Sequence, residues 1–245
     1  YRLIVGRAWP IIVANSAGPL LGLTDTAVIG RTGSGAALGA IALGSLIFSF
    51  VYWTFGFLRM GTTGFVAQAN GSGEEVEVRA ALGRATLMGL VIGLGLIALQ
   101  VPIFRVALLL IDGSAEVEAT AATYLGIRIW GAPATLASYA LMGGLIGLGR
   151  SRTLLGVQVF MNALNIGLDV LFAGYLGMGV EGFALGTIIA EWTAAGLSLA
   201  LMVRILRARH RDGDGFWPWA RIVDGRALIR TVFVQLDIMV RTLTL

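Results

Sequence analysis

The chain has 245 residues, of which 57% are hydrophobic and only 13% are charged. Because a water-soluble domain carries about 25% charged residues, this composition argues against a soluble enzyme or binding domain and predicts an all-α polytopic membrane protein. The formal net charge is +4, and all 18 basic residues are arginines, most of them in short segments between apolar spans. That spacing argues against a nucleic-acid-binding groove, and the lack of cysteine excludes disulfides and thiolate metal ligands.

The first apolar span covers about residues 8–30 and contains two prolines, Pro10 near its start and Pro19 in its middle. Proline removes a backbone hydrogen bond, so both residues are expected to help this helix bend. Asp25 stands inside the same span, and Asn15 lies close to the same helix face. A carboxylate in a membrane interior is costly and marks a functional site by default, although a purely structural Asp25 remains the alternative.

Three further spans are predicted at about residues 38–69, 85–110 and 119–148. The second of the chain's spans is long enough to contain a break, which we expect at the Gly-Thr-Thr-Gly sequence of residues 61–64. Arg59 stands inside this span, where its side chain either reaches toward an interface or pairs with an acid elsewhere. Arg128 is a second arginine within an apolar span.

The fifth span, residues 153–172, is apolar except for a few polar residues with a regular spacing. Asn162, Asn165 and Asp169 stand at positions i, i+3 and i+7, so a helix places them on one face within about 60°. We interpret this face as the floor of a binding site. The alternative is that Asp169 caps a neighbouring element at the membrane edge.

The sixth span covers about residues 182–203 and carries Thr187 and Glu191 one helical turn apart. A polar linker follows, and its sequence FWPWARIV predicts a segment at the lipid interface. A seventh span begins near residue 227 and is cut off, so we expect a piece of a longer protein. The expected organisation is a six-helix transmembrane lobe at residues 1–206, a cytoplasmic or interfacial linker at 207–226, and the truncated start of helix seven at 227–245.

The arginines are distributed asymmetrically between the two sides of these spans. Thirteen lie in the N-terminal segment and in the segments after spans two, four and six, whereas the opposite side has only Arg31 and Arg105. The positive-inside rule therefore predicts a cytoplasmic N-terminus. The expected location is a bacterial-type cytoplasmic (inner) membrane, with several crossings.

Several motifs, in their order along the chain, resemble those of the multidrug and toxic compound extrusion (MATE) transporters. They are Pro10 followed by Asp25 in LTDTAVIG, then GTTGFVAQANGSGE (61–74), GLGRSRT, NIGLDVLF (165–172) and VEGFALGT (180–187). The C-terminal sequence DIMVRTLTL is similar to helix seven of the DinF-like branch of this family. The resemblance spans almost the whole chain.

This resemblance implies two six-helix lobes related by a pseudo-twofold axis, with this chain as the N-terminal lobe, the linker and the start of the second lobe. It also implies a transporter rather than an enzyme, which exports organic, often cationic compounds and is driven by inward H⁺ or Na⁺ flow without another cofactor. The implied partners are a small organic substrate, the lipid bilayer and the remaining C-terminal lobe. The implied coupling site consists of Asp25, Asn165, Asp169 and Thr187.

The chemistry of these residues suits a small cation independently of the resemblance. Two carboxylates, an amide oxygen and a hydroxyl are hard oxygen ligands, and two acids in one low-dielectric pocket titrate as a coupled pair. Our hypothesis is that H⁺ or Na⁺ at Asp25 and Asp169 competes with, or is coupled to, binding of a cationic substrate. No other metal is expected. Four further residues are candidates for an additional cavity: Asn15, Asn162, Glu191 and Tyr139.

Three alternatives to a cation-coupled exporter are a flippase, an intramembrane protease and a half-transporter that dimerises. A flippase for lipids or lipid-linked oligosaccharides shares the two-lobe plan, and an N-lobe cavity lined by Arg59 and Arg128 would favour it. An intramembrane aspartyl protease would need a GxGD signature, but Ile166 and Leu168 occupy its glycine positions. A half-transporter that dimerises is disfavoured by the truncated seventh span.

Overall fold

The computed structural model describes residue 9 and residues 35–109, 114–210 and 215–244, with side chains as far as residue 234. The first predicted span lies outside these residues, and with it the expected site and bend residues Pro10, Asn15, Pro19 and Asp25.

The described part of the chain forms helices and no strand. The elements, in chain order, are α2 (Gly35–Thr54), α3 (Phe57–Gly71), α4 (Glu75–Ala98), α5 (Gln100–Leu109), α6 (Ala115–Arg128), the 3₁₀ turn η1 (Ile129–Gly131), α7 (Ala132–Gly147), α8 (Ser151–Asp169), the π-helix η2 (Val170–Tyr175), α9 (Gly179–Arg207), α10 (Trp219–Ile222) and α11 (Gly225–Thr244).

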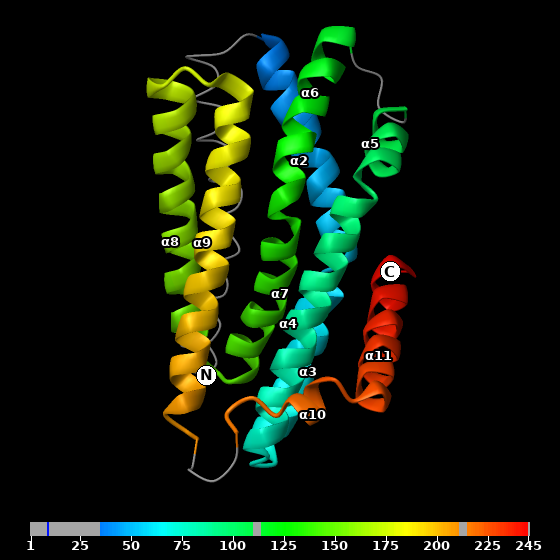
Figure 1. Cartoon of the computed structure of the whole chain (residues 1–245), viewed down its shortest axis with the longest axis vertical. Coiled ribbons are helices and arrows are strands. Elements are labelled where there is room, and N and C mark those ends of the chain that lie inside the picture. The colour runs from blue at the N-terminus through cyan, green and yellow to red at the C-terminus, as the bar shows by residue number, and fades with distance from the viewer. Residues whose placement is uncertain (1–8, 10–34, 110–113, 211–214, 245) are drawn as a thin grey trace.

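Five helical segments within these residues are long and apolar enough to cross a membrane: Gly35–Gly71, Glu75–Ala98, Ala115–Gly147, Ser151–Tyr175 and Gly179–Arg207. They stand side by side with similar directions, and α8 and α9 form a neighbouring pair at one side of the bundle (Figure 1). The predicted all-α polytopic membrane fold is therefore confirmed.

The break in the second span lies at Phe55 and Gly56, so the expected break at residues 61–64 was wrong. The backbone N–H groups of Phe55 and Gly56 donate to carbonyls three residues earlier, both at 3.0 Å, which tightens the turn between α2 and α3. The two threonines in the expected break instead lie inside α3. Thr62 Oγ1 donates to the Leu58 carbonyl at 2.6 Å and Thr63 Oγ1 to the Arg59 carbonyl at 2.8 Å, so both hydroxyls are satisfied by their own helix.

The fourth span is also made of two helical pieces, α6 and α7, with η1 between them. Pro133 stands in the first turn of α7, where it cannot donate the backbone hydrogen bond that would continue a regular α-helix. The 3₁₀ turn η1 connects α6 to α7 at this point in place of a regular α-helical turn. The junction lies on the side of α6 and α7 that packs against α9.

Glycines allow α7 to approach its neighbours closely, as small residues do in membrane helices. A Cβ atom at Gly143 would meet the backbone carbonyl of Arg59 in α3, and one at Gly93 of α4 would meet the backbone of Pro133. Thr63 Oγ1 also lies 3.2 Å from the Gly143 carbonyl oxygen, within hydrogen-bonding distance across the two helices. The centre of the bundle is thus held by backbone-to-backbone approach.

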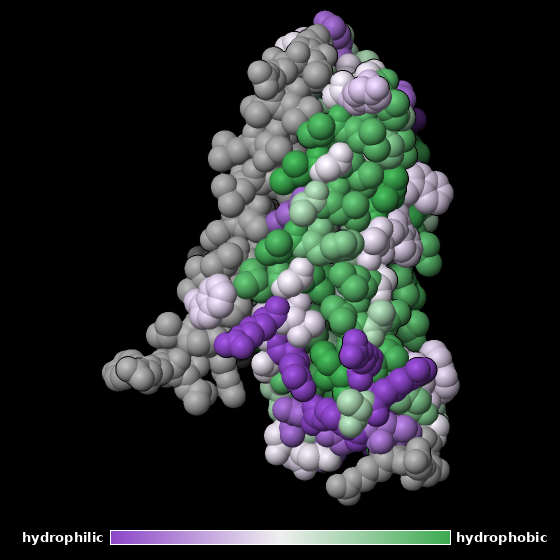
Figure 2. Space-filling model, turned by 90° about the vertical axis from the view of Figure 1, so that its left-hand side faces the viewer, coloured by the Kyte–Doolittle hydropathy of each residue, from purple (hydrophilic) through white to green (hydrophobic). Residues whose placement is uncertain are grey.

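One end of the bundle, which we call the basic end, carries the α3–α4 turn, the end of α9 and the short helix α10. Hydrophilic residues gather at this end, below a broad apolar surface (Figure 2). Arg209 pairs with Glu75, and Arg84 Nη1 donates to the Arg221 carbonyl at 2.8 Å. The segment after α9 is therefore fastened back onto the start of α4.

The close approach of α7 and α3 predicts different effects for two glycine substitutions. Gly143→Ala should lower the stability of the full chain by about 1–3 kcal/mol, because the added methyl group has no room against a backbone carbonyl. Gly64→Ala, on an exposed position with open space around it, should be neutral or stabilise the helix by up to about 1 kcal/mol. Thermal unfolding of the purified protein in detergent measures both, and equal midpoints for the two variants would contradict this packing.

Candidate functional site

The predicted polar face of α8 is buried in the structure. Asn165 is 2% exposed and Asp169 is 1% exposed, and Asn162 is buried one turn earlier on the same helix. Burial of an amide and a carboxylate in a membrane helix is costly unless polar partners lie close by. The helix that supplies such partners is α9.

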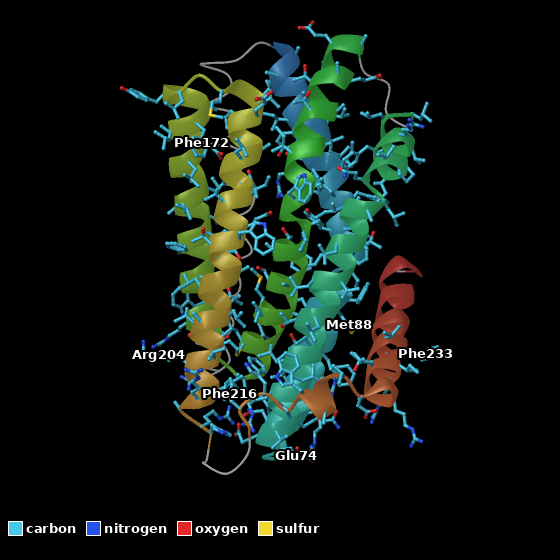
Figure 3. All side chains as sticks on the ribbon, viewed as in Figure 1. Glu74, Met88, Phe172, Arg204, Phe216 and Phe233 are labelled. Carbon is cyan, nitrogen blue, oxygen red and sulfur yellow. The ribbon has the colours of Figure 1, made fainter. Side chains whose placement is uncertain are left out.

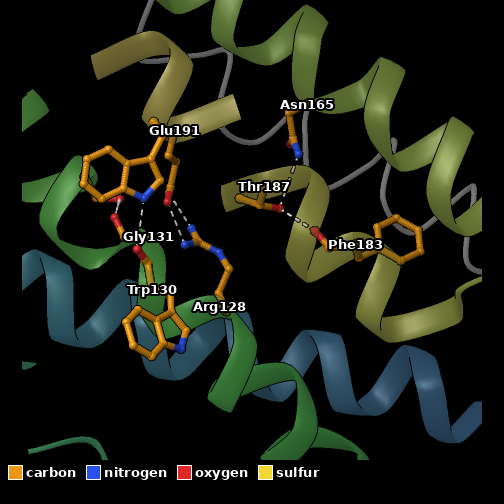
Figure 4. Close-up of polar contacts among 9 residues, drawn as sticks. Arg128, Trp130, Gly131, Asn165, Phe183, Thr187 and Glu191 are labelled. Atoms are coloured by element: carbon orange, nitrogen blue, oxygen red, sulfur yellow. Dashed lines mark hydrogen bonds and ion pairs between the residues drawn. The ribbon is translucent and has the colours of Figure 1, made fainter. Parts of the chain in front are cut away.

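Thr187 of α9 brings a hydroxyl to this polar face. Asn165 Nδ2 donates to Thr187 Oγ1 at 3.3 Å, and Thr187 Oγ1 donates to the Phe183 carbonyl at 2.9 Å (Figure 4). Gly186 lies beside Asp169, since a Cβ atom there would touch the carboxylate oxygen Oδ1. The structure therefore brings Asn165, Asp169 and Thr187 together between α8 and α9.

Asn165 keeps one acceptor that could serve a ligand. Its Oδ1 atom is buried and has no hydrogen-bond partner among the described residues. Such an oxygen beside a carboxylate and a hydroxyl suits a proton or a small hard cation. The fourth predicted member of the site, Asp25, lies outside the described residues, so its place in the site stays a prediction.

The helix changes its geometry immediately after Asp169. The π-helix η2 covers Val170–Tyr175, and π turns are rare in proteins and occur frequently at functional sites. The wider turn begins at the residue that follows the carboxylate. Nothing in the sequence indicated this π-helix, because its mainly apolar residues continue the helical pattern.

A buried ion pair lies one turn further along α9. Arg128 Nη1 donates to Glu191 Oε2 at 2.8 Å and Nη2 donates to Oε1 at 2.5 Å, which is the two-point geometry of a strong pair (Figure 4). The Arg128 guanidinium also lies 5.2 Å from the ring centre of Phe48. Glu191, which we predicted to line a cavity, is therefore ion-paired with Arg128.

This pair connects α9 to the junction between α6 and α7. Gly131 in η1 leaves room for it, because a Cβ atom there would collide with Glu191 Oε2 and Arg128 Nη1. The neighbouring Trp192 Nε1 donates to the Trp130 carbonyl at 3.1 Å (Figure 4). Sequence reasoning noted the Arg and the Glu separately but missed the pair, although opposite charges inside two apolar spans were a usable signal.

Aromatic side chains near the site, among them the cavity candidate Tyr139, are distributed between the core and the surface. Phe48 and Tyr52 are buried in the hydrophobic core, and Tyr139 is half-buried against it. Trp53 is exposed and lines an apolar groove between α2 and α5. Within the described residues, no group of three or more His, Cys, Asp or Glu side chains could hold a metal ion.

Known proteins resemble the chain over most of its length. The MatE family model matches residues 10–171. The chain is 40% identical over 207 residues to the DNA damage-inducible protein F of Escherichia coli, a match that covers 84% of this chain and 45% of that protein. It is 32% identical over 213 residues to a probable multidrug resistance protein NorM of Neisseria meningitidis, again over 84% of this chain and 45% of that protein.

The fold has solved counterparts as well. A crystal structure described as MATE in the straight conformation matches with a TM-score of 0.79 at 21% identity, and the match covers 98% of this chain and 52% of that one. The chain spans about half the length of the curated relatives and solved structures that it matches.

The Arg128–Glu191 pair predicts a strongly non-additive double-mutant cycle. Arg128→Met or Glu191→Leu alone leaves one buried charge without its partner and should cost about 3–5 kcal/mol of stability. The double variant Arg128→Met/Glu191→Leu removes both charges and should recover most of that loss. Unfolding of the purified full chain in detergent measures the cycle. A double variant as unstable as the sum of its two single variants would contradict the pairing.

Proposed function

Since the chain belongs to the MatE family, we propose that it is the N-terminal lobe of a secondary antiporter that exports organic, cationic compounds or drugs in exchange for H⁺ or Na⁺. The names of its relatives support this proposal, because NorM of Neisseria meningitidis is described as a probable multidrug resistance protein. The protein acts in the inner membrane with its N-terminus in the cytoplasm, as the distribution of arginines predicts.

The observation that carries the proposal is the buried polar contact between α8 and α9. Asn165 and Thr187 are hydrogen-bonded, and Asp169 is buried beside them. A carboxylate there is the natural acceptor for a transported proton, and the amide and hydroxyl oxygens are additional ligands for Na⁺. Asp25 completes the site by resemblance, and Pro10 and Pro19 allow its helix to change shape when the charge is neutralised.

The coupling follows from competition for negative charge. When Asp169 is ionised, the lobe offers a cationic substrate an attractive field in a low-dielectric setting. When H⁺ or Na⁺ neutralises the site, that attraction is lost and the substrate is released. A small cation and an organic cation thus exchange across the membrane without a covalent step.

The flippase alternative depended on arginines that face a cavity with free positive charge. Arg128 is paired in a two-point contact with Glu191 and covered by Phe48, so its charge is compensated within the protein. This pairing removes Arg128 as support for a carrier of phosphate-bearing lipids, whereas Arg59, the other arginine of that alternative, is half-buried and has no ion pair among the described residues.

Replacement of the buried acid should abolish coupling. Asp169→Asn keeps the size of the side chain but removes its charge, so drug efflux by cells that express the complete protein should fall to the level of cells without the transporter. Glu181→Gln changes an exposed acid at the start of α9 and should leave efflux unchanged. Efflux at the wild-type rate in the Asp169→Asn variant would refute the assignment.

The coupling ion can be identified separately. Proteoliposomes with the complete protein receive either a pH gradient or a Na⁺ gradient, and accumulation of a fluorescent organic cation is followed. We expect one of the two gradients to drive accumulation, with Asp25→Asn and Asp169→Asn both abolishing it. Accumulation that responds to neither gradient would contradict antiport.

A further inference from the structure

A buried arginine at the basic end has no counter-charge within the part of the chain that the structure describes. The side chain of Arg79, in the second turn of α4, is buried at 2% exposure. It makes neither an ion pair nor a hydrogen bond with any residue that the structure describes, and its Nε atom is buried without a partner. Its guanidinium carbon lies 5.9 Å from the ring centre of Phe216. Burial of a lone charge costs several kcal/mol, so the site calls for an anion.

Each acid around Arg79 either pairs with another arginine or is exposed, although Glu75 Oε2 is buried without a hydrogen-bond partner among the described residues. Glu75 pairs with Arg209, and Glu77 pairs with Arg84 and lies 3.9 Å from Arg221. Glu74 is exposed at the start of the helix (Figure 3). Among the described residues, Arg84, Arg209 and Arg221 each have a glutamate partner, whereas the buried Arg79 has none.

Arg79 lines a pocket that is large enough for a ligand. The pocket has a volume of about 780 Å³ and is formed by Gly73, Glu74, Glu75, Val76, Arg79, Arg209, His210 and Arg221. Two lining residues, Glu75 and Val76, belong to the first turn of α4, a helix of 24 residues. The pocket therefore lies at the N-terminus of this helix, where the positive end of the helix dipole favours an anion. Three arginines therefore line one pocket, together with Glu74 and Glu75.

We propose that this pocket binds a phosphate group, with Arg79 as its central ligand and Arg209 and Arg221 at the rim. Guanidinium groups match phosphate oxygens in a two-point geometry. The phosphate comes either from the headgroup of an anionic phospholipid or from free phosphate. The exposed Trp219 of α10 suits the headgroup, because tryptophan gathers at membrane interfaces. The site is separate from the α8–α9 contact and does not depend on the transport activity.

Thermal unfolding of the full chain in detergent tests the proposal with three probes: phosphatidylglycerol, phosphatidylcholine and inorganic phosphate. Phosphatidylglycerol alone raises the wild-type midpoint if the source is a lipid headgroup, and inorganic phosphate raises it if the source is free phosphate. Arg79→Gln should require at least about tenfold more of the effective probe for the same rise, because it removes a charged hydrogen-bond donor.

Two further variants keep the test decisive. Arg152→Gln changes an exposed arginine in the first turn of α8 that lines no pocket described above, and it should respond like the wild type. Arg221→Gln changes a rim residue whose side chain is 59% exposed, so this variant tests the pocket even if Arg79→Gln fails to fold. It should also reduce the rise in the unfolding midpoint that the effective probe causes. The proposal is overturned if no anionic probe shifts the wild-type midpoint, if phosphatidylcholine acts as well as phosphatidylglycerol, or if Arg152→Gln loses as much as the pocket variants.

Discussion

The high cost of an unpaired polar group in an apolar interior governs this structure. Threonines inside the spans donate to carbonyls of their own helix one turn earlier, as at Thr62, Thr86, Thr187 and Thr193. Arg128 and Glu191 satisfy each other with two hydrogen bonds. Against this background, Asn165 Oδ1 and Arg79 Nε stand out as buried polar atoms without a partner among the described residues.

Local periodicity was enough to predict the helices and the polar face of α8. Asn162, Asn165 and Asp169 lie on one face because helical geometry alone requires it, and the structure buries all three. The neighbour of that face was proposed only by family resemblance, and Thr187 does lie against Asn165. Whether Asp25 joins them stays a prediction, since it is outside the described residues.

Features that depend on distant contacts escaped sequence reasoning. Arg128 and Glu191 are 63 positions apart, and no local pattern connects them. The break in the second span was placed at residues 61–64 because two glycines and two threonines weaken a helix, but intrahelical hydrogen bonds and close packing against α7 override that propensity. The docking of the linker on α4 likewise depends on side chains from separate parts of the chain.

The helix α9 connects the candidate site to the rest of the bundle. Thr187 contacts Asn165 of α8, while Glu191 and Trp192, one turn later, hold the junction of α6 and α7. A rotation or shift of α9 would therefore disturb the α8 contact and the α6–α7 junction together. In the antiporter that we propose, α9 is therefore the element that would carry a change of charge at Asp169 to a second span.

The contacts that fasten the linker have a property that follows from their chemistry. Every basic partner in the ion pairs at this end is a guanidinium, whose planar group presents several hydrogen-bond donors in a fixed geometry. Arg209, which follows α9, accordingly contacts both Asn70 of α3 and Glu75 of α4. A single side chain therefore joins the segment after α9 to two helices at once.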